Sequence, residues 1–206
     1  QPGSVRLIAV SKTHPPGAIV AAHAAGQLHF GENYLQEALD KMQQLATLPL
    51  HWHYIGPIQS NKTRELARHF DWIHTVDREK VALRLNEQRP AERGQLNVLL
   101  QVNISEEISK AGVSLQELPA LAAVVGKLPH LKLCGLMTIP APEDDFTRQR
   151  AAFHSLVVAR QQLQALGYQH CRELSMGMSH DFAAAIAEQA SMVRIGTDIF
   201  GSRAKA

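Results

Sequence analysis

The sequence predicts an α/β protein built as a single (β/α)8 barrel, the TIM-barrel architecture. Short apolar segments alternate with amphipathic segments along the chain, and eight apolar segments with seven amphipathic segments between them can be counted. Several of the short segments are apolar throughout, as strands are when both faces of a parallel sheet are covered by helices. Eight strand–helix units favour closure into a barrel. An open doubly wound sheet is the alternative, although neither a G-x-G-x-x-G motif nor a Walker P-loop supports it.

Composition is typical of one compact domain. The chain is 45% hydrophobic and long enough for one well-buried core, so residues 1–206 are expected to form one domain. The 21 basic and 19 acidic residues are interspersed, so neither nucleic acid nor a membrane surface is an expected partner. Cys134 and Cys171 lie far apart, which fits reduced thiols in a cytoplasmic protein. No apolar run approaches the roughly 20 residues of a membrane span.

The eight expected strands are runs of aliphatic, β-branched and aromatic residues that end at glycine, proline or polar residues. The first run leads into a segment that Pro15 and Pro16 prevent from continuing as strand, and the fifth is the clearest because it is almost continuously apolar. In chain order, the strands are expected at residues 5–10, 28–30, 51–55, 72–76, 96–104, 131–136, 173–175 and 192–195.

Helices are expected between these strands, where apolar residues recur at helical spacing. Gly26 is placed to end the first helix, and Asp77 to cap the fourth. Ser114 and Glu117 have the S-x-x-E form of a capping box before the fifth helix. In chain order, the helices are expected at residues 18–25, 35–45, 61–69, 77–86, 115–125, 146–166 and 182–189.

Lys12 directly follows the first strand, at the end of the barrel where such folds carry their chemistry. Partial burial lowers the pKa of an amine and makes it a nucleophile toward carbonyl groups. A solvated loop lysine is the alternative. Asn33, Met137, Ser175 and Arg194 lie at the ends of other strands, and no pair of carboxylates is among them. A mechanism of the glycosidase type is therefore not expected.

The ends of the last two strands have the chemistry of a phosphate site. Gly177 and Gly196 allow backbone N–H groups to approach a ligand closely, and Ser179 and Thr197 can donate hydroxyl hydrogen bonds. Late strands are where barrels often bind phosphate. Asp181 opposes this interpretation, because its carboxylate would compete for the same positive helix end. Helix capping and turn geometry are the alternative roles for these residues.

A lysine, a phosphate cup and an arginine on one face together suggest pyridoxal 5′-phosphate (PLP). Lys12 would hold the aldehyde as a Schiff base, and the cup would hold the phosphate. Arg194 would face the pyridine nitrogen and, because arginine stays protonated, would weaken the ring as an electron sink. His51 and His53 share one strand face, but no third ligand with suitable spacing is evident, so a metal site is not expected.

Several longer motifs resemble one family and together cover essentially the whole chain. They are AVSKT at residues 9–13, FGENYLQE at 30–37, WHYIGPIQSNK at 52–62, GLM at 135–137, SMGMSHD at 175–181 and VRIGTDIFG at 193–201. In this order they are similar to the YggS/PROSC family of PLP homeostasis proteins. His14 is a departure, because many members carry a second lysine there. The family's N-terminal helix is also absent from this chain, so either one side of the barrel is expected to be uncovered or upstream residues are expected to be missing.

The resemblance implies a single-domain barrel of the alanine-racemase N-terminal type, PLP fold type III, with PLP on Lys12. It places Asn33 near the ring substituents, Met137 in the pocket lining, and Ser179, Gly196 and Thr197 around the phosphate. Neither a catalytic nor a metal-binding residue is expected. The full set of expected cofactor-binding residues is Lys12, Asn33, Met137, Ser175, Met178, Ser179, Arg194, Gly196 and Thr197.

The function implied by the resemblance is that of a cytoplasmic PLP carrier, expected to be a monomer. It would maintain intracellular vitamin B6 balance and hand PLP to apo PLP-dependent enzymes, without catalytic turnover. A PLP-dependent amino-acid racemase is the alternative. A racemase needs a second base on the opposite face of the cofactor, which a tyrosine of a C-terminal domain supplies in alanine racemases. Tyr34, Tyr54 and Tyr168 belong to no such domain, so the carrier is favoured.

Overall fold

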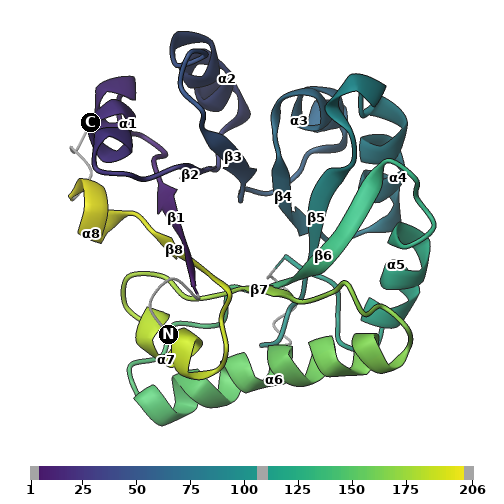
Figure 1. Cartoon of the computed structure of the whole chain (residues 1–206). Coiled ribbons are helices and arrows are strands. Elements are labelled where there is room, and N and C mark those ends of the chain that lie inside the picture. Colours follow the sequence, from purple (N-terminus) through teal and green to yellow (C-terminus); the bar gives the residue numbers. More distant parts are fainter. Residues whose placement is uncertain (1–4, 106–110, 202–206) are drawn as a thin grey trace.

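Eight parallel strands close into a barrel, in which each strand pairs with the next along the chain and the last pairs with the first. The computed structural model describes residues 5–105 and 111–201. The helices lie outside the strands and follow one another around the barrel in sequence order (Figure 1). The predicted (β/α)8 barrel is confirmed, and the open sheet is wrong. The predicted domain bounds, 1–206, reach beyond the described residues at both ends.

The strands begin and end close to their predicted bounds. They are β1 (Arg6–Val10), β2 (His29–Glu32), β3 (His51–Tyr54), β4 (Trp72–Val76), β5 (Leu96–Gln101), β6 (Leu131–Met137), β7 (Glu173–Ser175) and β8 (Met192–Ile195). The largest difference is at β5, which ends three residues before its predicted end. Directly after β5, Val102 forms an isolated bridge with Val113 and belongs to no strand.

The helices also follow the predicted order, with one addition. They are α1 (Pro16–Ala24), α2 (Leu35–Gln44), α3 (Thr63–His69), α4 (Glu79–Gln88), α5 (Leu118–Val125), α6 (Phe146–Ala165), α7 (Phe182–Ala187) and α8 (Thr197–Phe200), with short 3-10 turns η1 (Ser60–Lys62) and η2 (Ala91–Arg93). The four-residue α8 was not predicted, because it is too short to show a helical period. No helix in the two described ranges is long and apolar enough to cross a membrane.

The two predicted helix starts had different outcomes. The capping box is present, because Glu117 N donates to Ser114 Oγ (3.2 Å) while Ser114 Oγ donates to Glu117 Oε2 (2.6 Å). The helix that follows nevertheless begins at Leu118, not at 115. The prediction that Asp77 caps α4 is wrong, because Arg78 is the residue directly before the helix. The carboxylate of Asp77 accepts a hydrogen bond from the guanidinium of Arg78 (2.5 Å).

Alternation along the strands separates two environments. Outward-facing side chains such as Phe30, Trp52 and Ile73 pack under the helices in the main hydrophobic core. Inside the barrel, a smaller apolar cluster contains Ile8, Leu99, Cys134, Met137 and Met192. The same inward-facing rows end at the C-terminal end of the strands with polar residues, which form the site described next.

Candidate cofactor-binding site

One cavity at the C-terminal end of the barrel contains most of the predicted site residues. Seven of them line it, namely Lys12, Asn33, Met178, Ser179, Arg194, Gly196 and Thr197. Side chains that were not predicted complete the lining, namely Val10, Ile55, Ile139 and His180. The cavity volume is about 260 Å³. That lies just below the roughly 300–1,000 Å³ of pockets for drug-sized ligands, so the cavity suits a ligand with one aromatic ring.

Two predicted residues lie outside the lining of this cavity. Met137 is fully buried in the apolar cluster inside the barrel, against residues such as Ile8 and Leu99. Ser175 is also fully buried and contacts the cavity only through its neighbour Arg194. The family position occupied here by His14 is outside the lining as well, because the His14 ring packs 5.1 Å from the ring of Phe200.

Arg194 is a fixed, buried cation beside the cavity. Its side chain extends from β8 and is held at both terminal nitrogens: Nη1 donates to Ser175 Oγ (2.7 Å) and Nη2 donates to the carbonyl of Thr138 (2.9 Å). Burial lowers the pKa of Arg194 to about 10, and the charge of Asp181 opposes that shift. The guanidinium is therefore still protonated at neutral pH, with an orientation that its two partners fix.

Asn33 lines the cavity and carries an unused acceptor. Its Oδ1 atom is buried, and it has no hydrogen-bond partner within the described part of the chain. The backbone of Asn33 is fixed by Gly56, where a Cβ atom would lie 2.2 Å from the Asn33 carbonyl oxygen, so only glycine fits. Because an unpaired buried acceptor is costly, a ligand that donates a hydrogen bond here would bind favourably.

The loop after β7 takes its shape from a glycine and an aspartate. Gly177 has φ of +95°, and a Cβ atom there would lie 2.7 Å from Ala185 Cβ. Asp181 Oδ1 accepts a hydrogen bond from Met178 N (2.6 Å), so the carboxylate that could repel an anion closes the loop instead. Ser179 lines the cavity together with Thr197, the two hydroxyl residues that the sequence predicts for an anion site.

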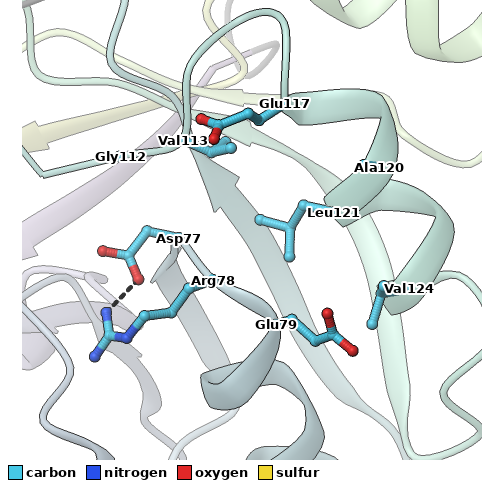
Figure 2. A pocket seen from close by; sticks show the side chains of 9 residues that line it. All are labelled: Asp77, Arg78, Glu79, Gly112, Val113, Glu117, Ala120, Leu121 and Val124. Atoms are coloured by element: carbon cyan, nitrogen blue, oxygen red, sulfur yellow. Dashed lines mark hydrogen bonds and ion pairs between the residues drawn. The ribbon is translucent and has the colours of Figure 1, made fainter.

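A larger hollow, of about 400 Å³, lies between the starts of α4 and α5 (Figure 2). Asp77, Glu79 and Glu117 place three carboxylates around it. Arg78, its one cation, is already bound to Asp77 and to the carbonyl of Ile58 (2.6 Å). This excess of negative charge opposes a phosphate, so charge rather than size favours the smaller cavity at the strand ends.

Sequence reasoning missed a chain of hydrogen bonds inside the barrel. His74 Nδ1 lies 2.9 Å from Ser175 Oγ, His53 Nδ1 lies 2.9 Å from His74 Nε2, and His29 Nδ1 lies 3.0 Å from His53 Nε2. Together with Arg194 these residues form the interior chain. Arginine can only donate hydrogen bonds, so Ser175 Oγ accepts one from Arg194. Its hydroxyl can then donate a hydrogen bond to Nδ1 of His74. Each imidazole can then donate to the next while remaining neutral.

Burial keeps these imidazoles neutral. Burial is the main cause that lowers the pKa of His53 and His74 well below 6.5, and it lowers the pKa of the half-buried His29 to about 4. Over the described ranges, no group of three or more His, Cys, Asp or Glu side chains could hold a metal ion. His51 and His53, the pair considered from the sequence, make different contacts. His53 belongs to the interior chain, while the ring of His51 stacks on that of His29, with 4.7 Å between their centroids.

Residues 2–204 match the family described as alanine racemase, N-terminal domain, and together with the closed barrel this defines the chain as an alanine-racemase-type barrel. The pyridoxal phosphate homeostasis protein of Escherichia coli (strain K12) is 55% identical over 205 residues, which cover 98% of this chain and 87% of that protein. The chain belongs to the YggS/PROSC family of pyridoxal phosphate homeostasis proteins, as its motifs predict.

Solved structures agree with this assignment. The structure of PipY from Synechococcus elongatus PCC7942 with PLP bound is 41% identical and superposes with a TM-score of 0.89, over 98% of this chain and 94% of that one. An alanine racemase from Corynebacterium glutamicum has a TM-score of 0.75 at 19% identity, over 97% of this chain and 57% of that one. At that identity, the likeness to the racemase shows a common fold alone.

Proposed function

We propose that this chain binds PLP in the cavity at the strand ends and carries it reversibly, without catalytic turnover. The observation that carries the proposal is the meeting of Lys12, the unpartnered Oδ1 of Asn33 and the buried Arg194 in one cavity sized for a single ring. The homeostasis protein of E. coli and the PLP-bound PipY structure support it. The chain would act as a cytoplasmic monomer that supplies apo PLP-dependent enzymes.

Each lining residue has a role that its chemistry supports. Lys12 would hold the ligand covalently, Arg194 would lie beside the pyridine nitrogen, and Asn33 would accept a hydrogen bond from a ring substituent. Ser179 and Thr197 would donate to the phosphate, with the backbone of the adjoining loops. When bound, PLP supplies an aldehyde that an amine can hold reversibly, with loss of one water on binding and its uptake on release.

Racemisation is the second candidate, because the barrel is shared with alanine racemases. It needs a second proton-transferring group on the other face of the ligand. Tyr54 donates its hydroxyl to the carbonyl of Pro57 (3.1 Å), and neither Tyr34 nor Tyr168 lines the cavity. His180 does line it, with a half-exposed ring 3.5 Å from Asp181, and it would be the base in a racemase.

A titration with PLP tests the binding proposal. We expect a visible absorption band typical of a Schiff base in the unmodified chain, fixed irreversibly by borohydride, and no such band in Lys12→Ala. Mass spectrometry of the reduced protein should place the added mass on the peptide that contains Lys12. A band of equal intensity in Lys12→Ala would overturn the assignment of the linkage.

Incubation of the loaded protein with L-amino acids in deuterated water separates carrier from racemase. The carrier proposal predicts transfer of PLP to an added apo-enzyme, with no deuterium at Cα beyond a PLP-only control. Deuterium exchange at Cα at turnover rates, together with a slower exchange in His180→Asn, would establish the racemase instead.

A further inference from the structure

The loop that presents Lys12 is fastened by a buried lysine on the neighbouring helix. Lys41, on α2, is only 3% exposed. Its Nζ atom donates to the carbonyl of Ser11 (2.7 Å), to Glu32 Oε1 (2.7 Å) and to Glu37 Oε1 (2.5 Å). These four residues, Ser11, Glu32, Glu37 and Lys41, are called the Lys41 cluster below. The residue immediately before Lys12 is thus bonded directly to the buried ammonium.

The same cluster also holds the residue after Lys12. The backbone N–H of Thr13 donates to Glu37 Oε1 (2.6 Å), the oxygen that Lys41 also contacts. On the other side, Ser11 Oγ donates to Glu32 Oε1 (2.6 Å). The backbone before Lys12 is therefore bonded to the Lys41 ammonium, and the backbone after it to the carboxylate of Glu37, which the same ammonium contacts.

Thr13 shows that this part of the loop is held in an unfavourable conformation. Its φ is +66°, in the left-handed region that β-branched residues avoid. Such a conformation persists only when the surroundings fix it, and such residues concentrate at ligand sites. The bond from Thr13 N to Glu37 is a direct constraint of this kind.

The composition of the cluster is poorly suited to stability alone. Two carboxylates share one buried ammonium, and Glu32 Oε2 has no hydrogen-bond partner in the described ranges. Buried ion pairs are often no more stabilising than apolar side chains of the same volume, so packing of α2 on the barrel does not require this one. Neither carboxylate nor Lys41 lines the cavity, so the cluster can act on a ligand there only indirectly, and its direct bonds to Ser11 and Thr13 lead to Lys12.

We propose that Lys41 and Glu37 are positioning residues that hold the Lys12 amine in place for an aldehyde ligand. This inference rests on the proposed function, in which Lys12 holds PLP covalently. The cluster fixes where the Lys12 side chain leaves the backbone, which shortens the search of the amine for the bound aldehyde. It would make no contribution to binding of the ring or the phosphate, which the residues that line the cavity would contact.

The test compares PLP with pyridoxine 5′-phosphate, which has the same ring and phosphate but an alcohol in place of the aldehyde. In Lys41→Met and Glu37→Ala we expect the visible band to appear more slowly after mixing with PLP, by about 10- to 100-fold. The affinity for pyridoxine 5′-phosphate should stay within about twofold of the unmodified chain, because that ligand cannot use the Lys12 amine.

Two further variants serve as controls. Glu37→Gln keeps an oxygen acceptor for Thr13 N and should recover most of the rate that Glu37→Ala loses. Asp40→Asn changes a charge on the exposed side of the same helix and should have no effect. Thermal unfolding of each variant shows whether it folds; if Lys41→Met does not, Glu37→Ala carries the test, because Glu37 is 30% exposed.

Three results are contrary to expectation, and they differ in meaning. If the affinity for pyridoxine 5′-phosphate fell by the same factor as the rate of band formation with PLP, the Lys41 cluster would be only structural. Unchanged rates with PLP in both variants would exclude a positioning role. Absence of the visible band in the unmodified chain would overturn the proposed function itself, whatever the variants do.

Discussion

Arg194 donates a hydrogen bond from Nη1 to Ser175 Oγ over 2.7 Å, and both residues are buried. Ser175 was predicted from its motif to bind the cofactor, yet it lies outside the cavity lining and contacts an arginine that is within it. Its position is better explained by its partners, because the same hydroxyl lies 2.9 Å from His74 Nδ1. Ser175 thus joins the cation of the cavity to the imidazoles inside the barrel.

Substitution of Ser175 by alanine tests this role. In Ser175→Ala, a buried guanidinium donor and His74 both lose a partner, so we expect a loss of about 1–3 kcal/mol in the free energy of unfolding, measured with urea. Ser179→Ala is the matched control, since Ser179 lines the cavity and should lower PLP affinity with little effect on stability. The opposite pattern, with Ser175→Ala fully stable, would remove Ser175 from the interior chain.

The interior chain also predicts a particular dependence of stability on pH. Burial depresses the pKa of His53 and His74 in the folded state, so each binds a proton more readily when unfolded. The stability that depends on neutral His53 and His74 is therefore fully present above pH 6.5, the pKa of histidine in the unfolded chain. It is lost as the pH falls below that value. Each histidine should lower the unfolding free energy by at most about 1.4 kcal/mol per pH unit.

Urea unfolding between pH 7.5 and pH 5 measures this effect. His53→Asn cannot take up the proton, so its stability should fall less steeply with pH than that of the unmodified chain, even if it is lower throughout. His170→Gln, at an exposed position, should leave the slope unchanged. If His53→Asn and the unmodified chain show parallel pH profiles, protonation of the interior chain is not what limits stability in acid.

The barrel could be predicted from the sequence because its strands are short, strongly apolar and regularly spaced. Errors arose where local signals compete. Asp77 is a good capping residue, but Arg78 follows it and takes its carboxylate. The apolar run after Gln101 continues beyond the sheet, because periodicity reports burial and not pairing.

Interior contacts could not be predicted, because they depend on register between strands. The spacing of His51 and His53 shows that they share a face, but only the pairing of β2 with β3 sets His51 beside His29. His74 reaches Ser175 from a strand 101 residues earlier in the chain. For the same reason the bond from Lys41 to Ser11 carries no sequence signal, since Lys41 reads as one more polar residue of an amphipathic helix.

Gly177 offers a test of the loop that presents Ser179. Alanine at 177 would combine a positive φ with a Cβ atom 2.7 Å from Ala185 Cβ. Gly167 has a similar φ of +104° but nothing within 4 Å of the added Cβ, so Gly167→Ala measures the backbone strain alone. We expect Gly177→Ala to be less stable than Gly167→Ala by about 1–3 kcal/mol in thermal or urea unfolding.

Gly177→Ala should also weaken binding of phosphate-bearing ligands, because the 177–179 loop must move to relieve the clash between the new Cβ atom and Ala185. Isothermal titration with pyridoxine 5′-phosphate measures this without the covalent link. Equal stability of the two alanine variants would show that the loop yields without cost, and the site would then not depend on Gly177.

Asn33 should behave in the opposite way to Ser175, because its Oδ1 has no partner to lose in the described chain. We expect Asn33→Ala to change the free energy of unfolding by no more than about 0.5 kcal/mol. The same change removes an acceptor for the ligand and should weaken PLP binding by about tenfold, the value of one hydrogen bond. Fluorescence titration and urea unfolding of the same preparation give both numbers. A large loss of stability without a change in PLP affinity would show that Asn33 supports the barrel and does not bind the cofactor.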